Sequence, residues 1–188
     1  MNYLFFKRFC DLMLALLLLI LLVPIFTLIA IIIYLEDRGP FLFKQKRIGV
    51  NGQEFDFYKF RSMPLNTPLV QSSETNKIRI TKFGKFIRRT NLDELPQFYN
   101  VLKGDMSFIG PRPPIPSQLD LIGYRKSNGA IKLRPGLTGL AQVNSFDGMT
   151  PFQKSEYDGI YANSISLKAD VLILFKTIIY FTKIPPTY

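Results

Sequence analysis

The feature that most constrains this chain is an uncharged, almost wholly apolar run from Leu12 to Leu35. As a helix at about 1.5 Å per residue, the run would reach roughly 36 Å, enough to cross a hydrocarbon core of about 30 Å. Pro24 lies near its middle, where it removes a backbone donor and kinks a helix. Each half is then only about 16–18 Å long, or about half a bilayer. The run therefore fits either a kinked span or a helix that enters the membrane and returns.

Basic residues flank both ends of this run. They are Lys7 and Arg8 before it and Arg38, Lys44, Lys46 and Arg47 after it. Such residues favour the cytoplasmic side of a membrane, so a helix with both ends there would bend at Pro24 and come back. We therefore predict a re-entrant membrane helix hairpin over residues 1–36. A tilted, kinked span remains the alternative, since proline also occurs in spanning helices. A signal peptide is disfavoured because the run is long and no small-residue cleavage site follows it.

The composition excludes several kinds of catalytic site. The chain has no His and one Cys, Cys10, so it has no Ser-His-Asp triad, no His-ligated zinc site and no intrachain disulfide. Acid–base or nucleophilic work must fall to carboxylates, Lys, Tyr, Ser or Thr. The net charge of +10 suits nucleic acid, anionic lipid or a phosphorylated substrate. Because of the apolar run, we expect anionic membrane lipids as partners and no nucleic acid.

The remaining chain, residues 37–188, reads as a compact domain on the cytoplasmic face, with amphipathic interfacial helices. Alternating apolar residues on both sides of Asn51-Gly52 predict a β-hairpin over residues 41–60, since a type I′ turn needs positive φ at both central residues. Helical patterns are expected at residues 81–89, 93–103, 151–162 and 171–184. The last of these suits either a core helix or a membrane-surface helix. The predicted fold class is thus mainly α with a small β-hairpin (α+β).

The adjacent carboxylates Asp93 and Glu94 are the strongest candidates for chemistry. They follow a basic cluster, and phosphoryl chemistry needs carboxylates for a nucleophile or metal ligand, with cations to hold phosphate oxygens. Placed at the start of a helix over residues 93–103, they could equally be N-terminal helix charges. The basic cluster consists of Lys82, Lys85, Arg88 and Arg89.

Four further charged residues have both a functional and a plain interpretation. Arg112 and Arg134 lie in rigid Pro-containing loops and could bind phosphate or be surface cations. Lys59 could contact substrate or decorate a strand, and Asp158 could belong to a helix salt-bridge pattern. The combination of basic loops, an acidic pair and a membrane element indicates a phosphate site at a membrane surface.

Several segments, in order, resemble the bacterial sugar transferases, small monotopic phosphoglycosyl transferases that act on polyprenol phosphate. The resemblance covers nearly the whole chain, and on it we expect the chain to be near the family's minimal catalytic unit. The kink differs, because Val23 precedes Pro24 where relatives often have Ser, so its geometry is open. The segments are Lys7-Arg8-x-x-Asp11 with the Pro-broken apolar helix, then residues 57–63, 92–97, 102–113 and 134–143, and Tyr157-Asp158.

The resemblance implies a two-step transfer in which Asp93 attacks the β-phosphate of a nucleoside diphosphate sugar, UDP-sugar by family habit. This first step releases nucleoside monophosphate and leaves a sugar-phosphoryl aspartate. The sugar-phosphoryl group then passes from the aspartate to polyprenol phosphate. The resemblance also implies Mg²⁺, with Asp93 as a ligand. It implies that Glu94 deprotonates the lipid phosphate or positions metal. It further implies a location on the cytoplasmic face of the bacterial inner membrane. The implied substrate-binding residues are Lys59, Arg88, Arg112, Arg134, Gln142 and Asp158.

Two rival functions stay open at this point. One is a membrane-anchored basic lipid-binding or scaffold protein without catalysis, which would not need Asp93. The other is an ordinary glycosyltransferase, which would release a nucleoside diphosphate; the sequence lacks the Gly-rich turn after a strand that such a fold would use. The sequence leaves open which sugar is moved, which glycan (O-antigen, capsule or glycoprotein) is built and whether the chain forms a homodimer.

Overall fold

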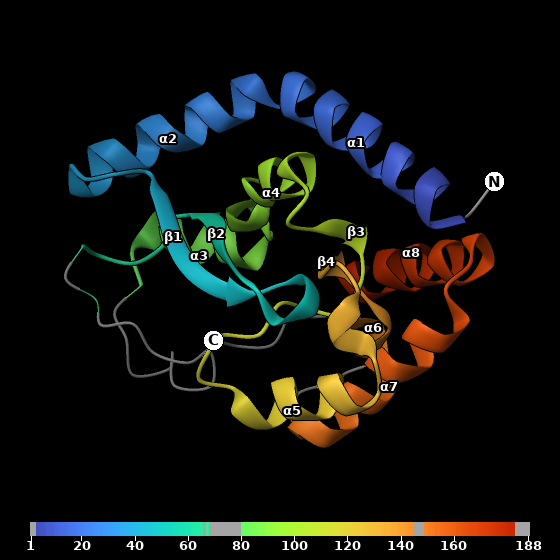
Figure 1. Ribbon diagram of the computed structural model, residues 1–188. Coiled ribbons are helices and arrows are strands. Elements are labelled where there is room, and N and C mark those ends of the chain that lie inside the picture. The colour runs from blue at the N-terminus through green and yellow to red at the C-terminus, as the bar shows by residue number, and fades with distance from the viewer. Residues whose placement is uncertain (1–2, 66, 68–79, 145–148, 183–188) are drawn as a thin grey trace.

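A computed structural model describes residues 3–65, 67, 80–144 and 149–182. The fold is mainly helical with two small sheets, which confirms the α+β prediction (Figure 1). The helices are α1 (Tyr3–Leu21), α2 (Val23–Asp37), α3 (Lys82–Arg89), α4 (Gln97–Lys103), α5 (Leu119–Ser127), α6 (Leu140–Asn144), α7 (Pro151–Ser164) and α8 (Leu167–Thr182). The strands are β1 (Leu42–Ile48), β2 (Glu54–Phe60), β3 (Ser107–Ile109) and β4 (Gly136–Thr138). Short 3-10 turns are η1 (Val50–Gly52), η3 (Leu92–Glu94) and η4 (Ala130–Lys132).

The apolar run forms two helices that arch over the rest of the molecule (Figure 1). They meet at Leu22 with a bend of 60°, and Pro24 lies in the first turn of α2. A proline is well placed there, because the first backbone N–H groups of a helix have no intrahelical partner. Within the described residues, neither helix alone is long and apolar enough to cross a membrane. The bent pair together has the length and the apolar composition of a membrane span. The predicted bend is confirmed, and the break precedes the proline.

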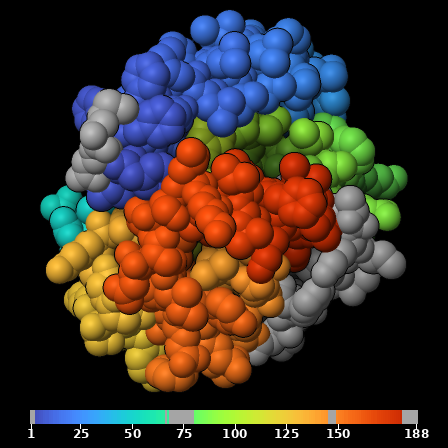
Figure 2. All heavy atoms as spheres, turned by 90° about the vertical axis from the view of Figure 1, so that its right-hand side faces the viewer, coloured from blue at the N-terminus to red at the C-terminus, as the bar shows by residue number. Residues whose placement is uncertain are grey.

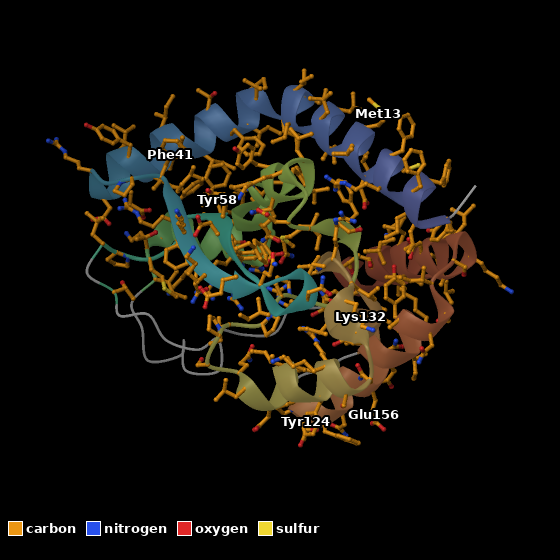
Figure 3. The ribbon with its side chains drawn as sticks, viewed as in Figure 1. Met13, Phe41, Tyr58, Tyr124, Lys132 and Glu156 are labelled. Atoms are coloured by element: carbon orange, nitrogen blue, oxygen red, sulfur yellow. The ribbon has the colours of Figure 1, made fainter. Side chains whose placement is uncertain are left out.

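The arch has an inner face that packs and an outer face that does not. Ala15 of α1 is fully buried against Phe55 and Val101, and Ile33 of α2 packs with Ile87 of α3. Large apolar side chains cover the outer face, where Met13 points away from the body of the protein (Figure 3). Some of the most exposed are Phe5, Leu17, Ile20, Leu21, Leu28 and Leu35. The hydrophobic core therefore crosses the expected boundary between residues 1–36 and the remainder.

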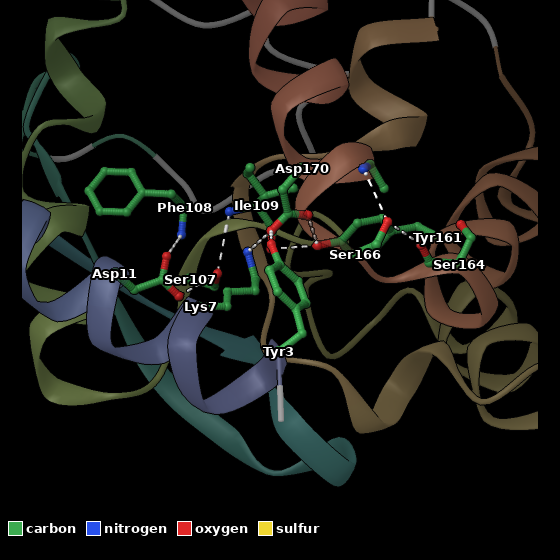
Figure 4. Close-up of polar contacts among 11 residues, drawn as sticks. Tyr3, Lys7, Asp11, Ser107, Phe108, Ile109, Tyr161, Ser164, Ser166 and Asp170 are labelled. Carbon is green, nitrogen blue, oxygen red and sulfur yellow. Dashed lines mark hydrogen bonds and ion pairs between the residues drawn. The ribbon is translucent and has the colours of Figure 1, made fainter. Parts of the chain in front are cut away.

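Polar side chains at the start of α1 fasten it to the body. Asp11 accepts hydrogen bonds from Ser107 Oγ at 2.8 Å and from the Phe108 backbone N–H at 3.2 Å (Figure 4). Arg8 donates to the carbonyl oxygens of Val101 at 2.9 Å and Leu102 at 3.3 Å, at the end of α4. The carbonyl groups at a helix C-terminus lack intrahelical donors, so a buried guanidinium satisfies them well.

Asp170 of α8 joins three helices. Its carboxylate accepts from Tyr3 Oη at 2.6 Å, Lys7 Nζ at 2.7 Å and Tyr161 Oη at 2.6 Å, so α1, α7 and α8 share one buried polar centre (Figure 4). Beside α1 in Figure 2, α8 lies on the surface of the molecule. Ile173 is buried, while Phe175 is 60% exposed. The helix expected over residues 171–184 therefore begins earlier, and its last two residues lie outside the described part of the chain.

The hairpin forms as predicted. β1 and β2 pair antiparallel, with Leu42 opposite Phe60 and Ile48 opposite Glu54. Asn51 and Gly52 both have positive φ, at 55° and 80°, and the Gln53 N–H bonds to the Val50 carbonyl oxygen, which is type I′ geometry inside a five-residue loop. Four of the helices and strands were not predicted: helices α5 and α6, and strands β3 and β4, which pair in parallel.

Candidate active site

The acidic pair lies in a turn of its own and not at the start of a helix. Asn91 adopts the left-handed conformation with φ of 55°, which closes the preceding helix α3 and opens the 3-10 turn η3. α4 begins only after Pro96, at Gln97. The expectation that Asp93 and Glu94 begin a helix over residues 93–103 is therefore wrong. The physical reason is that Pro96 caps a short helix of 7 residues, while the acidic pair belongs to the tighter turn before it.

Four charged side chains meet at this turn. Lys59 Nζ, from β2, lies 2.8 Å from Glu94 Oε1 and 3.4 Å from Asp93 Oδ2. Arg112 Nη2 lies 2.9 Å from the same oxygen of Glu94. Segments far apart in the sequence are thus brought together: the end of a strand, the 3-10 turn and the Pro-Arg-Pro loop. Three of the residues predicted from sequence form one connected ion-pair cluster around Asp93.

The two carboxylates differ in their electrostatic environment. Burial raises the pKa of Asp93, the nearby charge of Glu94 adds to that effect, and Lys59 only partly opposes it. Burial would raise the pKa of Glu94 too, but the charges and hydrogen bonds of Lys59 and Arg112 outweigh it and hold that pKa far below its usual range. Glu94 is therefore a fixed negative charge, and Asp93 is the carboxylate with the more reactive, less stabilised anion.

Beside the cluster lies a cavity of about 280 Å³. Asp93, Lys59 and Arg88 line it, together with Arg47 and Arg61. Asp93 is the one acidic residue among the described residues that form its wall, and five basic residues, Lys44 among them, share that wall. A cavity with one carboxylate and several cations suits an anionic ligand that reacts with the carboxylate.

Four predicted substrate-binding residues lie outside this cavity wall: Arg112, which pairs with Glu94, and Arg134, Gln142 and Asp158. Arg134 Nε donates to the Gly104 carbonyl oxygen at 3.1 Å, at the end of α4. Gln142 Nε2 donates to the Leu137 carbonyl oxygen at 3.1 Å. The substrate contacts of Arg134 and Gln142 remain predictions, because these recorded contacts are with the protein's own backbone.

Asp158 is buried inside the protein. It is 1% exposed, and Oδ2 accepts a hydrogen bond from Arg125 Nε at 2.8 Å and forms an ion pair with Nη2 at 2.6 Å. Burial raises the pKa of Asp158, and the charge of Arg125 opposes that rise. The plain interpretation from sequence, a salt-bridge pattern within its own helix, predicted an ion pair but not this partner. The partner comes from α5, a helix that the sequence did not predict.

Arg47 is a cavity residue that sequence reasoning did not select. Its guanidinium lies 5.2 Å from the centre of the Phe57 ring and donates to the Pro113 carbonyl oxygen at 3.1 Å. Burial and the charge of Arg112 lower the pKa of Arg47 to about 10. Directly opposite residues in an antiparallel pair share a face, and Arg47 pairs with Phe55 as Phe43 pairs with Lys59. The alternation of β1 would have placed Arg47 on the face of Lys59, once the register was known.

The sequence profile described as bacterial sugar transferase matches residues 2–183. The chain belongs to the bacterial sugar transferase family. A UDP-glucose:undecaprenyl-phosphate glucose-1-phosphate transferase of Klebsiella pneumoniae is 41% identical over 185 residues, which cover 92% of this chain and 39% of that protein. A UDP-N-acetylgalactosamine-undecaprenyl-phosphate N-acetylgalactosaminephosphotransferase of Aeromonas hydrophila is 41% identical over 188 residues, covering 94% of this chain and 43% of that protein.

Shorter members of the family align over most of their length. The exopolysaccharide production protein ExoY of Sinorhizobium fredii is 35% identical over 189 residues, which cover 92% of this chain and 83% of that protein. The chain therefore spans well under half of the first two sugar transferases and nearly all of the third. The resemblance found from the motifs is confirmed, and the ion-pair cluster lies within the matched region.

Proposed function

We propose that the protein transfers a sugar 1-phosphate from a nucleoside diphosphate sugar to a membrane polyprenol phosphate. The observation that carries this proposal is Asp93, a buried carboxylate that lines a cavity with Lys59 and Arg88. The names of the family members support UDP-sugar as donor and undecaprenyl phosphate as acceptor. Such a transfer begins the membrane stage of glycan assembly.

The chemistry proceeds in two displacements at phosphorus. An Asp93 carboxylate oxygen attacks the β-phosphate; the new O–P bond forms as the bond to the nucleoside monophosphate breaks. An oxygen of the polyprenol phosphate then attacks the sugar-phosphoryl group, which restores the Asp93 carboxylate and gives polyprenol diphosphate sugar. Covalent catalysis divides one difficult transfer into two easier ones. Lys59 and Arg88 supply positive charge where the phosphate oxygens lie.

We assign Glu94 an electrostatic role in place of proton transfer. Its pKa is held far below its usual range by Lys59 and Arg112, so it is a weak base at neutral pH. The same carboxylate oxygen binds both cations, at 2.8 Å and 2.9 Å. Glu94 thereby fixes the position of Lys59 beside Asp93 and aims Arg112 at the same site. This role differs from both roles that the resemblance implied, deprotonating the lipid phosphate and positioning metal.

The residues at the cavity also fit Mg²⁺. Mg²⁺ in phosphoryl-transfer sites is commonly bound by one or two carboxylates plus substrate phosphates, and Asp93 supplies a carboxylate on the cavity wall. No group of three or more acidic or Cys residues suited to hold a metal by itself exists among the described residues, so substrate oxygens would complete the coordination. When bound, the ion would neutralise the diphosphate and make the monophosphate a better leaving group.

We further propose that the α1–α2 arch is re-entrant and places the site at the cytoplasmic face of the bacterial inner membrane. The start of α1 is tied to the body by Lys7, Arg8 and Asp11. At the end of α2, Asp37 lies 3.5 Å from Arg61, the residue after β2. Two ends that dock on one domain favour the same side of a membrane, with the exposed apolar outer face in lipid between them.

The experiment is a turnover assay with purified protein, Mg²⁺, polyprenol phosphate and a panel of UDP-sugars, with nucleoside monophosphate as readout. We expect release with at least one sugar, and one equivalent per protein when the lipid is omitted, because Asp93 retains the phosphosugar. Asp93→Asn should abolish both signals and preserve membrane association, whereas Asp120→Asn, an exposed acid on α5, should match the wild type. Absence of release with every sugar contradicts the proposal and favours a lipid-binding scaffold, and release of nucleoside diphosphate favours a glycosyltransferase.

A further inference from the structure

Arg125 is a buried cation without a place in the chemistry described above. It lies on α5, is 4% exposed, and binds Asp158 of α7 through Nε and Nη2. Its remaining terminal nitrogen, Nη1, donates to the backbone carbonyl oxygen of Arg112 at 2.8 Å. One guanidinium thus connects the α5–α7 pair to the loop that carries an active-site cation.

The loop around Arg112 is held almost entirely through its carbonyl groups. Proline has no N–H, so Pro111, Pro113 and Pro114 can only accept hydrogen bonds. Gly136 N donates to Pro111 at 2.9 Å, Arg47 Nη1 to Pro113 at 3.1 Å and Ile48 N to Pro114 at 2.9 Å. The carbonyl group of Arg112 is the fourth in this series, and Arg125 is its donor.

The polar connections continue from this loop to the nucleophile. The Arg112 guanidinium pairs with Glu94 at 2.9 Å, Glu94 with Lys59 at 2.8 Å, and Lys59 with Asp93 at 3.4 Å. The Arg112 side chain itself is 49% exposed, so its surroundings alone do not fix its direction. A hydrogen bond that holds the Arg112 backbone therefore has a larger effect on the direction of this side chain than it would have on a side chain packed in a core.

We propose that Arg125 is a positioning residue for Arg112, and that Asp158 serves the reaction through Arg125 and does not contact substrate. This inference rests on the proposed function. Asp158 Oδ2 accepts a hydrogen bond from Nε and pairs with Nη2, so both contacts hold one edge of the guanidinium and leave Nη1 directed at the Arg112 carbonyl oxygen. The role replaces the substrate contact expected for Asp158 from the family resemblance.

The test must separate positioning from folding. Breaking a buried ion pair on one side leaves an unpaired buried charge, whereas replacing both partners by apolar residues often preserves stability. The central variant is therefore Arg125→Met combined with Asp158→Leu. It removes the donor to Arg112 while the interior stays filled. Lys126→Met, at an exposed neighbouring position, is the control for removing a cation from α5; the paired variant itself loses one charge of each sign and keeps the net charge.

The measurement is a double-mutant cycle in kcat/KM for nucleoside monophosphate release. In the wild-type background we expect the paired variant to lose at least about tenfold, mostly in kcat. In an Arg112→Ala background the same change should cost less than about twofold, because the side chain that it positions is gone. Lys126→Met should stay within about twofold of its parent in both backgrounds. Thermal unfolding of each variant monitors folding.

Equal losses in the two backgrounds, or no loss in the wild-type background, would overturn the positioning role. Should the paired variant unfold, Arg125→Lys carries the same cycle, because lysine can keep the charge beside Asp158 without reaching Asp158 and the Arg112 carbonyl together. Wild-type protein without turnover overturns the proposed function along with this inference. If the wild type turns over and the paired variant loses equally in both backgrounds, the positioning role is overturned and the proposed function is not.

Discussion

Lys59 Nζ lies 2.8 Å from Glu94 Oε1, the shortest ion pair at the candidate active site. The distance to Asp93 is longer, at 3.4 Å. The ammonium group of Lys59 thus stabilises the Glu94 carboxylate more than the Asp93 carboxylate. A nucleophilic carboxylate gains from that arrangement, since an anion fully satisfied by a cation is a poorer nucleophile. Burial raises the pKa of Asp93, and the closer contact of Lys59 with Glu94 leaves the Asp93 anion less stabilised.

Glu94→Gln should shift the pH dependence of the first displacement. Asp93 must be ionised to attack, and its raised pKa means that activity falls as pH falls through that value. Removing the negative charge of Glu94 leaves Lys59 to Asp93 and lowers the pKa of Asp93. We expect the acid limb of nucleoside monophosphate release, measured without lipid, to move to lower pH. Glu156→Gln, an exposed acid on α7, should leave the limb in place; an upward shift in Glu94→Gln would contradict the argument.

Asp93→Asn should stabilise the fold. Burial raises the folded pKa of Asp93 above its unfolded pKa of about 3.9. Below the unfolded pKa the group costs no stability. The cost grows as pH rises from the unfolded to the folded pKa, and it is fully present above the folded pKa. Asparagine has nearly the same shape and no charge. At neutral pH the unfolding midpoint should rise by about 2–4 °C for each kcal/mol relieved. The difference from wild type should shrink as pH is lowered, and a lower midpoint in the variant would refute this account.

Local patterns predicted local structure well. Proline inside an apolar run predicted the bend between α1 and α2, and Asn51-Gly52 predicted the hairpin. Gly104 ends α4 with φ of 104°, as expected of a glycine after a helix. Each of these features is decided by one or two residues and their immediate neighbours, so the sequence signal is direct.

The connections across the site were not predictable in the same way. The strands β3 and β4 have three residues each, and pairing over so short a length leaves no periodic signal. The Arg125–Asp158 pair depends on α5, and the contact of Asp11 with Ser107 joins residues 96 positions apart. Lys59, Glu94 and Arg112 were chosen from the sequence and lie in one ion-pair cluster, but the tertiary fold decides which carbonyl or carboxylate each charged residue reaches.

Asp11→Ala should destabilise the docking of α1. Asp11 is 6% exposed and accepts from Ser107 Oγ and Phe108 N, so its loss leaves two buried donors without an acceptor. A buried donor left unpaired costs about 1–3 kcal/mol, and we expect a total loss of about 2–5 kcal/mol in unfolding free energy. Chemical denaturation of protein in one detergent measures it. Met13→Ala, at an exposed position of α1, is the control, and an equal loss there would show that docking is not the cause.

Thiol labelling should place both ends of the arch on one side of the membrane. Cys10 is a free, exposed thiol near the start of the apolar run, and Arg38→Cys in a Cys10→Ser background supplies the matching probe after α2. Because Arg8 and Asp11 dock α1 on the body and Asp37 pairs with Arg61 at the end of α2, both probes lie beside one domain. An impermeant thiol reagent should therefore label both in inside-out vesicles and neither in intact spheroplasts. Labelling of the two probes from opposite sides would refute the re-entrant arrangement and favour a kinked span.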